Sequence, residues 1–207
     1  MSLTLVHATL EMDLCGHATL AAAHILFNEH FSDQDRLSFM TRSGKLDVTR
    51  NDQTIFLDFP SRPGRPIGID RALIEVLGID PVDAVLSRDL LVAFRSEADI
   101  RNFRPDYGRI ETLDAFALII TAPGTDVDFV SRFFAPRAGV LEDPVTGSAH
   151  CTLIPYWADR LGKLSLSARQ LSKRGGELHC ELRGDRVIIG GAAVEYLRGE
   201  INVETAS

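Results

Sequence analysis

The sequence predicts an α+β protein with two similar lobes, each a curled, mainly antiparallel sheet wrapped round a central helix. Two observations lead to this fold class. Strands, a helix and more strands follow one another twice along the chain, which excludes a doubly wound parallel sheet. A segment rich in Pro and Gly, residues 60–66, then separates the two halves. We predict a first lobe at residues 1–78 and a second at 79–207, with the last residues returning to the first lobe.

The first half begins with a predicted strand at Leu3–Ala8, followed by a helix at Gly16–Phe27. This helix is apolar almost all the way round, so we expect other elements to cover it on every side. A short amphipathic helix is predicted at Asp70–Leu77. Alternating patterns bounded by turn residues predict three strands between the helices: Arg36–Thr41, Lys45–Arg50 and Thr54–Phe59.

The second half contains a helix at Gly147–Leu161, ended by Gly162, and Pro155 inside it predicts a kink because proline removes a hydrogen bond. Apolar runs predict strands before this helix at Ala84–Leu86, Leu90–Phe94, Phe116–Thr121 and Asp128–Phe134. Glycine-containing turns separate the strands predicted after it: Arg169–Lys173, Glu177–Leu182, Arg186–Gly190 and Ala193–Leu197.

Composition restricts the classes of function. The chain has 207 residues, 45% hydrophobic and 25% charged, which is ordinary for a globular protein. A net charge of −7 and a pI near 5.3 argue against nucleic-acid binding. Three cysteines are too few for a disulfide scaffold, and no stretch approaches the roughly 18 apolar residues of a membrane span. We therefore expect a cytoplasmic protein whose partners are small solutes, not nucleic acid or membrane.

The most informative segment is 142–150, which places Asp143 and Pro144 directly before a helix start at Gly147 and Ser148. Free amides at a helix N-terminus attract anions, so an acid beside them indicates an active-site rim. The alternative is a capping motif with no chemistry. Gly16-His17-Ala18 repeats the arrangement of Gly147-Ser148-Ala149, and two such starts facing each other would hold a carboxylate.

These segments resemble the PhzF-like phenazine-biosynthesis family, which shares its fold with diaminopimelate epimerase. The resemblance is carried by four segments that together span the chain: Asp13–Thr19, Phe129–Pro136, Glu142–Ala149 and Ser172–Glu177. It implies two lobes with a ligand cleft between the two helix N-termini. It also implies that neither a metal nor an organic cofactor is needed.

The resemblance further implies cofactor-independent isomerase or epimerase chemistry, in which a proton moves on or off carbon in a small carboxylate-bearing substrate. His17, Asp143 and Ser148 would be the catalytic residues. The substrate would be bound by residues at the two helix starts: Gly16, Ala18, Thr146 and Gly147. For His17 and Ser148 the alternative is a hydrogen-bonding role at the helix start only.

The family's principal acid/base is a glutamate in a segment that precedes the first strand of this chain, so we expect the first lobe to be N-terminally incomplete. Glu11 lies at a different place in the pattern and does not take over that role. A non-catalytic ligand-binding or vestigial member therefore remains the alternative to an enzyme. An open sheet edge in the first lobe would favour a homodimer.

Other kinds of site fit the sequence less well. Cys15 directly precedes Gly16 whereas Cys151 lies about one turn beyond Gly147, so the two do not form the equivalent thiol pair used by epimerases. The histidines and cysteines lack the spacing of a metal site. Gly147-Ser148 is no nucleophile elbow, so a serine hydrolase is not expected.

Overall fold

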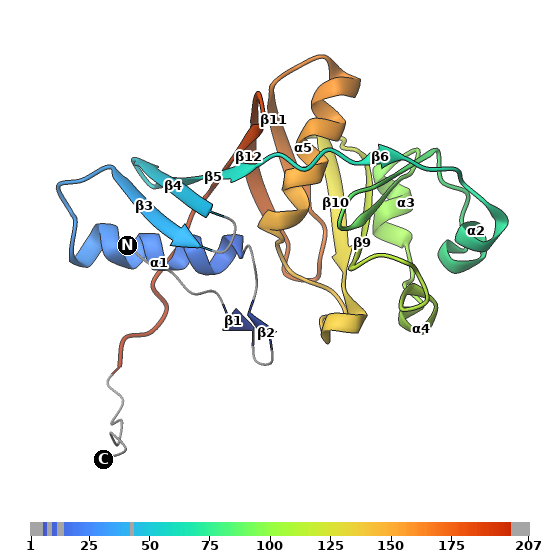
Figure 1. Ribbon diagram of the computed structural model, residues 1–207, viewed down its shortest axis with the longest axis horizontal. Helices are drawn as coiled ribbons and strands as arrows, with labels where there is room; N and C mark the ends of the chain where they lie inside the picture. Colours follow the sequence, from blue (N-terminus) through green and yellow to red (C-terminus); the bar gives the residue numbers. More distant parts are fainter. Residues whose placement is uncertain (1–5, 8–9, 12–14, 42–43, 200–207) are drawn as a thin grey trace.

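A computed structural model describes residues 6–7, 10–11, 15–41 and 44–199, and it confirms the predicted α+β fold class. The two lobes lie side by side, with one long helix in each (Figure 1). The helices are α1 (Gly16–Glu29), α2 (Arg71–Leu77), α3 (Glu97–Asn102), α4 (Tyr107–Ile110), the 3-10 helix η1 (Pro136–Ala138) and α5 (Gly147–Leu161). The strands are β1 (Val6–His7), β2 (Leu10–Glu11), β3 (Arg36–Thr41), β4 (Gly44–Asn51), β5 (Thr54–Pro60), β6 (Arg65–Pro66), β7 (Asp83–Leu86), β8 (Leu90–Ala93), β9 (Leu118–Pro123), β10 (Phe129–Phe134), β11 (Ser165–Gln170), β12 (Gly176–Arg183) and β13 (Arg186–Gly191).

The strands of the two lobes form one continuous sheet in the order β3-β4-β5-β13-β12-β11-β10-β9-β8-β7-β6, and β1 pairs with β2 separately. The pairs β8–β9 and β10–β11 are parallel and the other neighbours are antiparallel. The sequence suggested one sheet per lobe. The two are continuous because β13 pairs with β12 on one side and with β5 on the other, from Arg186 opposite Pro60 to Gly191 opposite Ile55.

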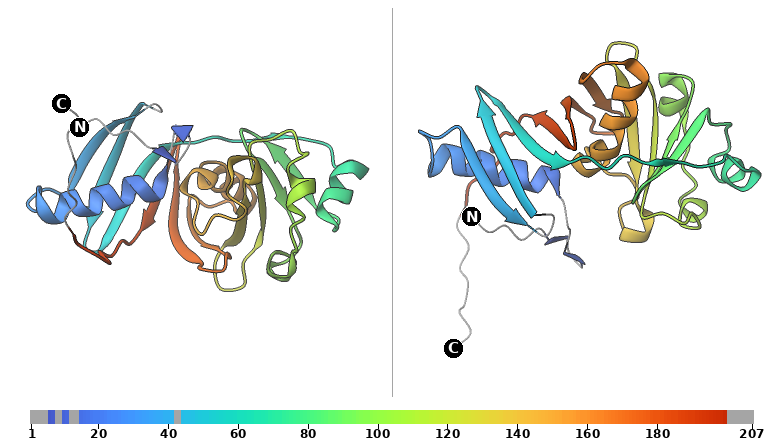
Figure 2. Two further views of the ribbon diagram at one scale, coloured as in Figure 1. Left: turned by 90° about the horizontal axis from the view of Figure 1, so that it is seen from below. Right: turned by 45° about the horizontal axis from the view of Figure 1, so that its top comes forward.

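Helix α1 buries one face only, and the expectation that it would be covered on every side is wrong for the described residues. Gly16, Thr19, Ala23 and Phe27, spaced three or four apart, are buried, whereas Ile25 is 40% exposed. The physical reason is that the sheet lies along one side of the helix, where β5 contacts it (Figure 2). The apolar sequence of α1 therefore did not determine how many of its faces are covered by other elements.

The sheet of the second lobe is covered on both faces. Helix α5 packs on one face in a core that includes Leu153, Ile154 and Trp157, while α2, α3 and α4 pack on the other through residues such as Leu73 and Ile100. Strands β8, β9 and β10 are accordingly buried along almost their whole length, as expected for strands with two covered faces.

The residue at which the lobes divide stays a prediction. Leu73 and Leu77 of α2 pack in the second lobe's core cluster, together with Ala84 and Leu90.

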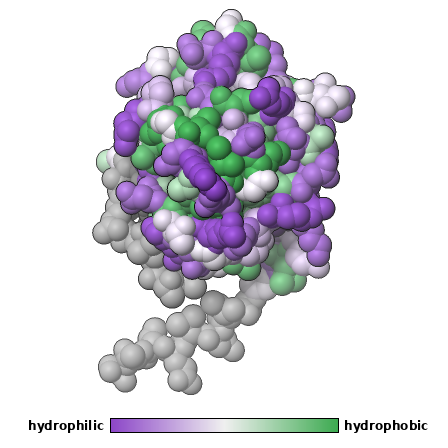
Figure 3. All heavy atoms as spheres, turned by 90° about the vertical axis from the view of Figure 1, so that its right-hand side faces the viewer, coloured by the Kyte–Doolittle hydropathy of each residue, from purple (hydrophilic) through white to green (hydrophobic). Residues whose placement is uncertain are grey.

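At the end of this lobe, apolar surface is surrounded by hydrophilic residues (Figure 3). The homodimer expected from the sequence also stays a prediction.

Several elements differ from the sequence prediction. The strand expected at Arg169–Lys173 lies earlier, as β11. Residues 193–197 form no strand: Val194, Tyr196 and Leu197 are exposed, and no strand of the described residues pairs with them. The short helices α3 and α4 were not predicted, although Ser96 and Asp99 form a capping box at the start of α3. Most of the strand expected at Leu3–Ala8 lies outside the described residues.

Helix α5 continues without a break through Pro155, which has no N–H to donate to the Cys151 carbonyl four residues earlier. That carbonyl accepts a hydrogen bond from the backbone N–H of Arg62 at 2.8 Å. The preceding residue, Ser61, donates its N–H to the Asp185 carbonyl, also at 2.8 Å. The interlobe segment is therefore attached to the second lobe through the Cys151 carbonyl, to which Pro155 cannot donate.

No described helix is long and apolar enough to cross a membrane.

Candidate active site

The first turns of α1 and α5 meet at two glycines. A Cβ atom placed on Gly16 would lie 3.0 Å from the Cα of Gly147, and one placed on Gly147 would lie 3.0 Å from the Cα of Gly16. The ring of Phe59 packs beside both glycines. Any side chain at either position would therefore push the two helix starts apart, so glycine is required for this approach. The structure thus brings together the two segments that the sequence marked as matching helix starts.

The two starts share their backbone geometry. The N-cap residues, Cys15 at φ −137°, ψ 98° and Thr146 at φ −112°, ψ 98°, are both extended, and neither side chain caps its helix. Four residues on, Thr19 Oγ1 donates to the Cys15 carbonyl at 2.8 Å, and His150 Nδ1 lies 2.8 Å from the Thr146 carbonyl. Because neither N-cap side chain occupies the first amides, both helix ends can offer N–H groups to an anion.

At the start of α1, a thiol and an imidazole lie in contact: Cys15 Sγ is 3.6 Å from His17 Nε2. Burial raises the pKa of the Cys15 thiol, but His17 and the backbone N–H of Ala18 outweigh it and lower the pKa below its usual value. The contact with Cys15 is the main cause that raises the pKa of His17, and the charge of Asp143 adds to this effect. Cys15, His17 and Asp143 are therefore electrostatically coupled.

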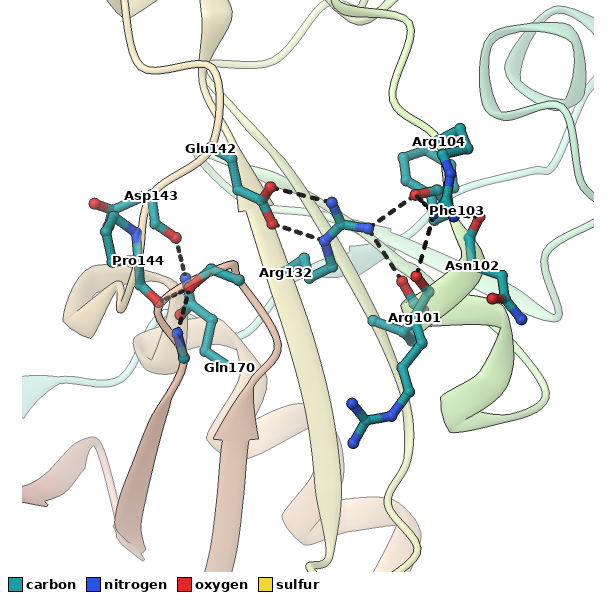
Figure 4. Close-up of polar contacts among 12 residues, drawn as sticks. Arg101, Asn102, Phe103, Arg104, Arg132, Glu142, Asp143, Pro144 and Gln170 are labelled. Atoms are coloured by element: carbon teal, nitrogen blue, oxygen red, sulfur yellow. Dashed lines mark hydrogen bonds and ion pairs between the residues drawn. The ribbon is translucent and has the colours of Figure 1, made fainter.

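At the start of α5, the side chain of Gln170 holds the loop that carries Asp143 (Figure 4). Gln170 is fully buried; its Oε1 accepts from the Thr146 N–H at 2.8 Å, and its Nε2 donates to the Asp143 carbonyl at 2.8 Å. The hydroxyl of Thr146 donates to the carboxylate of Asp143 in a short hydrogen bond. Both the position of the loop and the orientation of its acid are thus fixed by hydrogen bonds.

A buried ion pair anchors the same loop one residue earlier. Arg132, on β10, binds Glu142 through two hydrogen bonds of 2.7 and 3.1 Å. Its Nη1 donates to the carbonyls of Ile100 and Phe103 at the end of α3, at 3.2 and 2.9 Å (Figure 4). Because both partners are largely shielded from water, losing either would leave a buried charge unpaired.

Beside the loop, next to Gln170, lies a pocket of about 620 Å³.

His150 is fully buried in α5, where it packs against Phe129. Burial lowers its pKa to about 4, so the ring is neutral at neutral pH. Since its Nδ1 lies at the Thr146 carbonyl, the uncharged ring donates a hydrogen bond to that oxygen and so stabilises the N-cap residue of α5. Its Nε2 has no hydrogen-bond partner among the described residues.

The seven site residues predicted from the sequence all lie at or beside the two helix starts. Thr146 and Ser148 are buried, Ala18 is partly exposed and His17 is exposed. Asp13, from the same motif, lies outside the described residues. Three further residues lie at the site: Cys15, which was weighed from the sequence only as part of an unfavoured two-thiol arrangement, Gln170, and Arg88, whose Nη2 is 3.3 Å from Ser148 Oγ.

One of these additions left a signal in the sequence. Gln170 follows Leu166 and Ala168 at alternate positions, on the buried face of β11, where a polar side chain needs internal partners. Arg88 left no such signal because it lies in a short turn. Among the described residues, no group of three or more His, Cys, Asp and Glu side chains could hold a metal ion.

A two-lobed α+β fold in which both long helices start at a shared point defines an epimerase-like fold. Comparison with known proteins gives the family. The profile described as phenazine biosynthesis-like protein, PhzC-PhzF, matches residues 6–199. The chain belongs to this family, as the sequence motifs predicted.

Two relatives in this family match closely along the chain. An uncharacterized isomerase of Pseudomonas aeruginosa is 53% identical over 196 residues, covering 94% of this chain and 75% of its own length. The crystal structure of a PhzF-family protein from Enterococcus faecalis is 43% identical, with a TM-score of 0.93 over 98% of this chain and 78% of its own.

More distantly, a probable proline racemase from Agrobacterium radiobacter, with bound carbonate, has a TM-score of 0.64 at 10% identity, over 98% of this chain and 72% of its own. At that identity, the likeness shows a shared fold only.

Proposed function

We propose that this protein is a cofactor-independent isomerase that moves a proton on carbon in a small carboxylate-bearing substrate bound at the two helix starts. The contact between Gly16 and Gly147 carries the proposal, because it places two sets of helix N-terminal amides at one point. A carboxylate bound there would be held by the amides of Gly147 and Ser148, with Gly16 and Ala18 on the opposite helix. The names of the isomerase relatives support the same class of reaction.

The acid–base groups lie beside this point. Removing a proton from carbon requires a base, and returning it elsewhere requires an acid. Asp143 is one such group, oriented by Thr146, and the Cys15–His17 pair is the other. The lowered pKa of Cys15 and the raised pKa of His17 both favour a thiolate beside an imidazolium, which can accept and return a proton. Charge that develops on the substrate would be stabilised by the helix amides.

Deuterium exchange tests the proposal directly. The protein is incubated in D₂O with small cyclic and amino acids, including proline and trans-4-hydroxy-L-proline, the latter bound by a distant hydroxyproline epimerase from Agrobacterium vitis of the same fold. We expect deuterium at a carbon of at least one acid. Asp143→Asn should slow the exchange by about 100-fold or more, in line with the usual contribution of general acid–base catalysis.

A matched variant separates this effect from a change in the fold. Asp159→Asn removes a carboxylate at the exposed end of the same helix, α5, and should leave the exchange rate unchanged. Exchange by the intact protein that persists in Asp143→Asn would remove Asp143 from the mechanism. No exchange with any acid would instead leave ligand binding without turnover, the alternative considered from the sequence.

A further inference from the structure

The turn between β7 and β8 brings an arginine to the start of α5. The Ser87 N–H donates to the Asp89 carbonyl at 3.1 Å, and the Ser87 hydroxyl lies 3.0 Å from Thr152 Oγ1 on α5. The Arg88 carbonyl accepts from the Phe116 N–H at 3.2 Å. The main chain on which Arg88 sits is therefore fastened both to α5 and to the segment before β9.

The guanidinium of Arg88 is also held in one orientation. Asp89, which is 2% exposed, accepts from Arg88 Nε at 2.9 Å and from Nη2 at 2.8 Å. The Phe116 ring lies under the guanidinium, with its centroid 4.8 Å from Cζ. The two hydrogen bonds to Asp89 and the stacked Phe116 ring leave the Arg88 guanidinium little conformational freedom. Less conformational entropy is therefore lost when the guanidinium contributes to ligand binding.

The same Nη2 reaches Ser148 Oγ at 3.3 Å. A guanidinium can only donate hydrogen bonds, so the serine oxygen accepts in this contact. The Ser148 proton must then point to a different acceptor, and no described residue supplies one. A ligand carboxylate at the start of α5 would be such an acceptor, reinforced by the positive charge behind the hydroxyl.

The start of α1 lacks this support within the described part of the chain. His17 occupies the position equivalent to Ser148, and Arg174 acts on His17 only through space. We propose that Arg88, acting through Ser148, is a positioning residue that fixes the substrate carboxylate at the start of α5. The reacting carbon then lies toward Cys15, His17 and Asp143. This orientation rests on the proposed function for its carboxylate-bearing ligand.

Benzoate and benzamide test the inference, because the two differ chiefly in the negative charge. Their affinities are measured by NMR from the backbone amide signals of Gly147 and Ser148 in the full chain. We expect the unaltered protein to bind benzoate about tenfold or more tighter than benzamide. Arg88→Met should weaken benzoate binding by about 10- to 100-fold, as for a lost hydrogen bond to a charged group, and leave benzamide unchanged. Arg88→Lys should recover part of the loss because it keeps the charge.

Arg186→Met is the matched control. Arg186 pairs with Asp58 at 2.7 Å and is exposed to a similar extent, but its hydrogen bonds go to Asp58 of β5 and not to a residue of either helix start. It should bind both probes like the unaltered protein. If Arg88→Met does not fold, Ser148→Ala serves instead, and it should abolish the preference for benzoate with the guanidinium still in place.

Two results would overturn the inference: Arg88→Met, or its Ser148→Ala substitute, keeping the preference for benzoate, or the unaltered protein binding neither probe. Deuterium exchange distinguishes this failure from that of the proposed function. Exchange that does not depend on Arg88 removes the inference and leaves the isomerase. Benzoate binding that depends on Arg88, in a protein that exchanges no substrate, removes the isomerase and leaves the inference.

Discussion

The starts of α1 and α5 use the same backbone arrangement but differ in the side chains around it. Each has an extended N-cap residue, a glycine, and a polar side chain four residues later that contacts the N-cap carbonyl. At α1, the added groups are Cys15 and His17, which titrate and are partly open to solvent. At α5 they are buried hydrogen-bonding partners, chiefly Gln170.

We propose that this difference reflects separate roles for the two similar helix starts. Buried partners that do not ionise near neutral pH hold a backbone rigidly, which suits binding of a fixed anion. A partly exposed thiol beside an imidazole changes protonation state easily, which suits proton transfer. Both proposed roles would depend on the contact between Gly16 and Gly147 that the two helix starts share.

The largest expected effect follows from breaking that contact. In Gly147→Ala the new Cβ would lie 3.0 Å from the Cα of Gly16, so the helix starts must separate. We expect loss of benzoate binding and a fall of about 1–3 kcal/mol in the free energy of unfolding, as for overpacking. Gly68→Ala is the control, since a Cβ there meets nothing within 4 Å. Binding retained by Gly147→Ala would show that close approach of the helices is not required.

Acid should weaken the α5 end through His150. Its pKa is about 4 in the folded protein and near 6.5 when unfolded, so the unfolded chain takes up a proton that the folded chain excludes. Stability is therefore full above pH 6.5 and is lost as the pH falls toward 4, by at most about 3 kcal/mol. Urea unfolding at pH 7 and pH 4.5 measures this loss.

The variant His150→Phe should be less stable at pH 7, because the Thr146 carbonyl loses its donor, but should lose less on acidification. His179→Phe alters an exposed histidine and should keep the pH dependence of the unaltered protein. Equal acid sensitivity in the unaltered protein and in His150→Phe would contradict the assignment of this effect to His150.

Removing Gln170 tests the rigid support more narrowly. Gln170→Leu keeps the bulk but leaves the Thr146 N–H and the Asp143 carbonyl without their buried partner. We expect the free energy of unfolding to fall by about 1–3 kcal/mol, measured with urea at pH 7. The exposed Gln53 gives the control Gln53→Ala, expected within about 0.5 kcal/mol of the unaltered protein. A neutral Gln170→Leu would show that the loop needs no such support.

The smallest expected effect concerns the titrating end. Because the pKa of Cys15 is lowered mainly by His17, iodoacetamide should alkylate Cys15 at a lower pH than an ordinary thiol, and His17→Ala should move the midpoint upward. Mass spectrometry of the labelled peptide gives the rate at each pH. The buried Cys180, whose pKa is raised by burial, is the internal reference and should stay unreactive. If the pH midpoint of Cys15 alkylation is unchanged in His17→Ala, His17 does not lower the pKa of Cys15 and the proposed thiol–imidazole pair is wrong.

Local patterns predicted much of this fold and the core of its site. Helix α5 runs over the predicted Gly147–Leu161, because a glycine marks each end and apolar residues repeat between them. The meeting of the two helix starts was expected from their similar sequences and from the family resemblance. The first prediction uses a signal contained within the length of one helix, and the second uses two short motifs in different halves of the chain.

What could not be predicted depends on contacts between distant segments. The exposed side of α1 is set by how far the sheet extends around it, which its own apolar sequence does not encode. Arg88 reaches Ser148 from 60 positions away in the chain, and Gln170 reaches Thr146 from 24. The alternating pattern of β11 marks Gln170 as a buried polar side chain but does not identify its partner, and Arg88 lies in no periodic pattern at all.

The pairing of β5 with β13 also affects how a ligand of the proposed site would enter. Two lobes connected by a flexible hinge can open by bending between them, but here six residue pairs connect β5 with β13. The linker is in addition pinned at Arg62 to the carbonyl that Pro155 leaves open. Wide opening would break these bonds together. We therefore expect a ligand of the proposed site to enter through small local movements of loops and side chains, while the two lobes keep their relative positions.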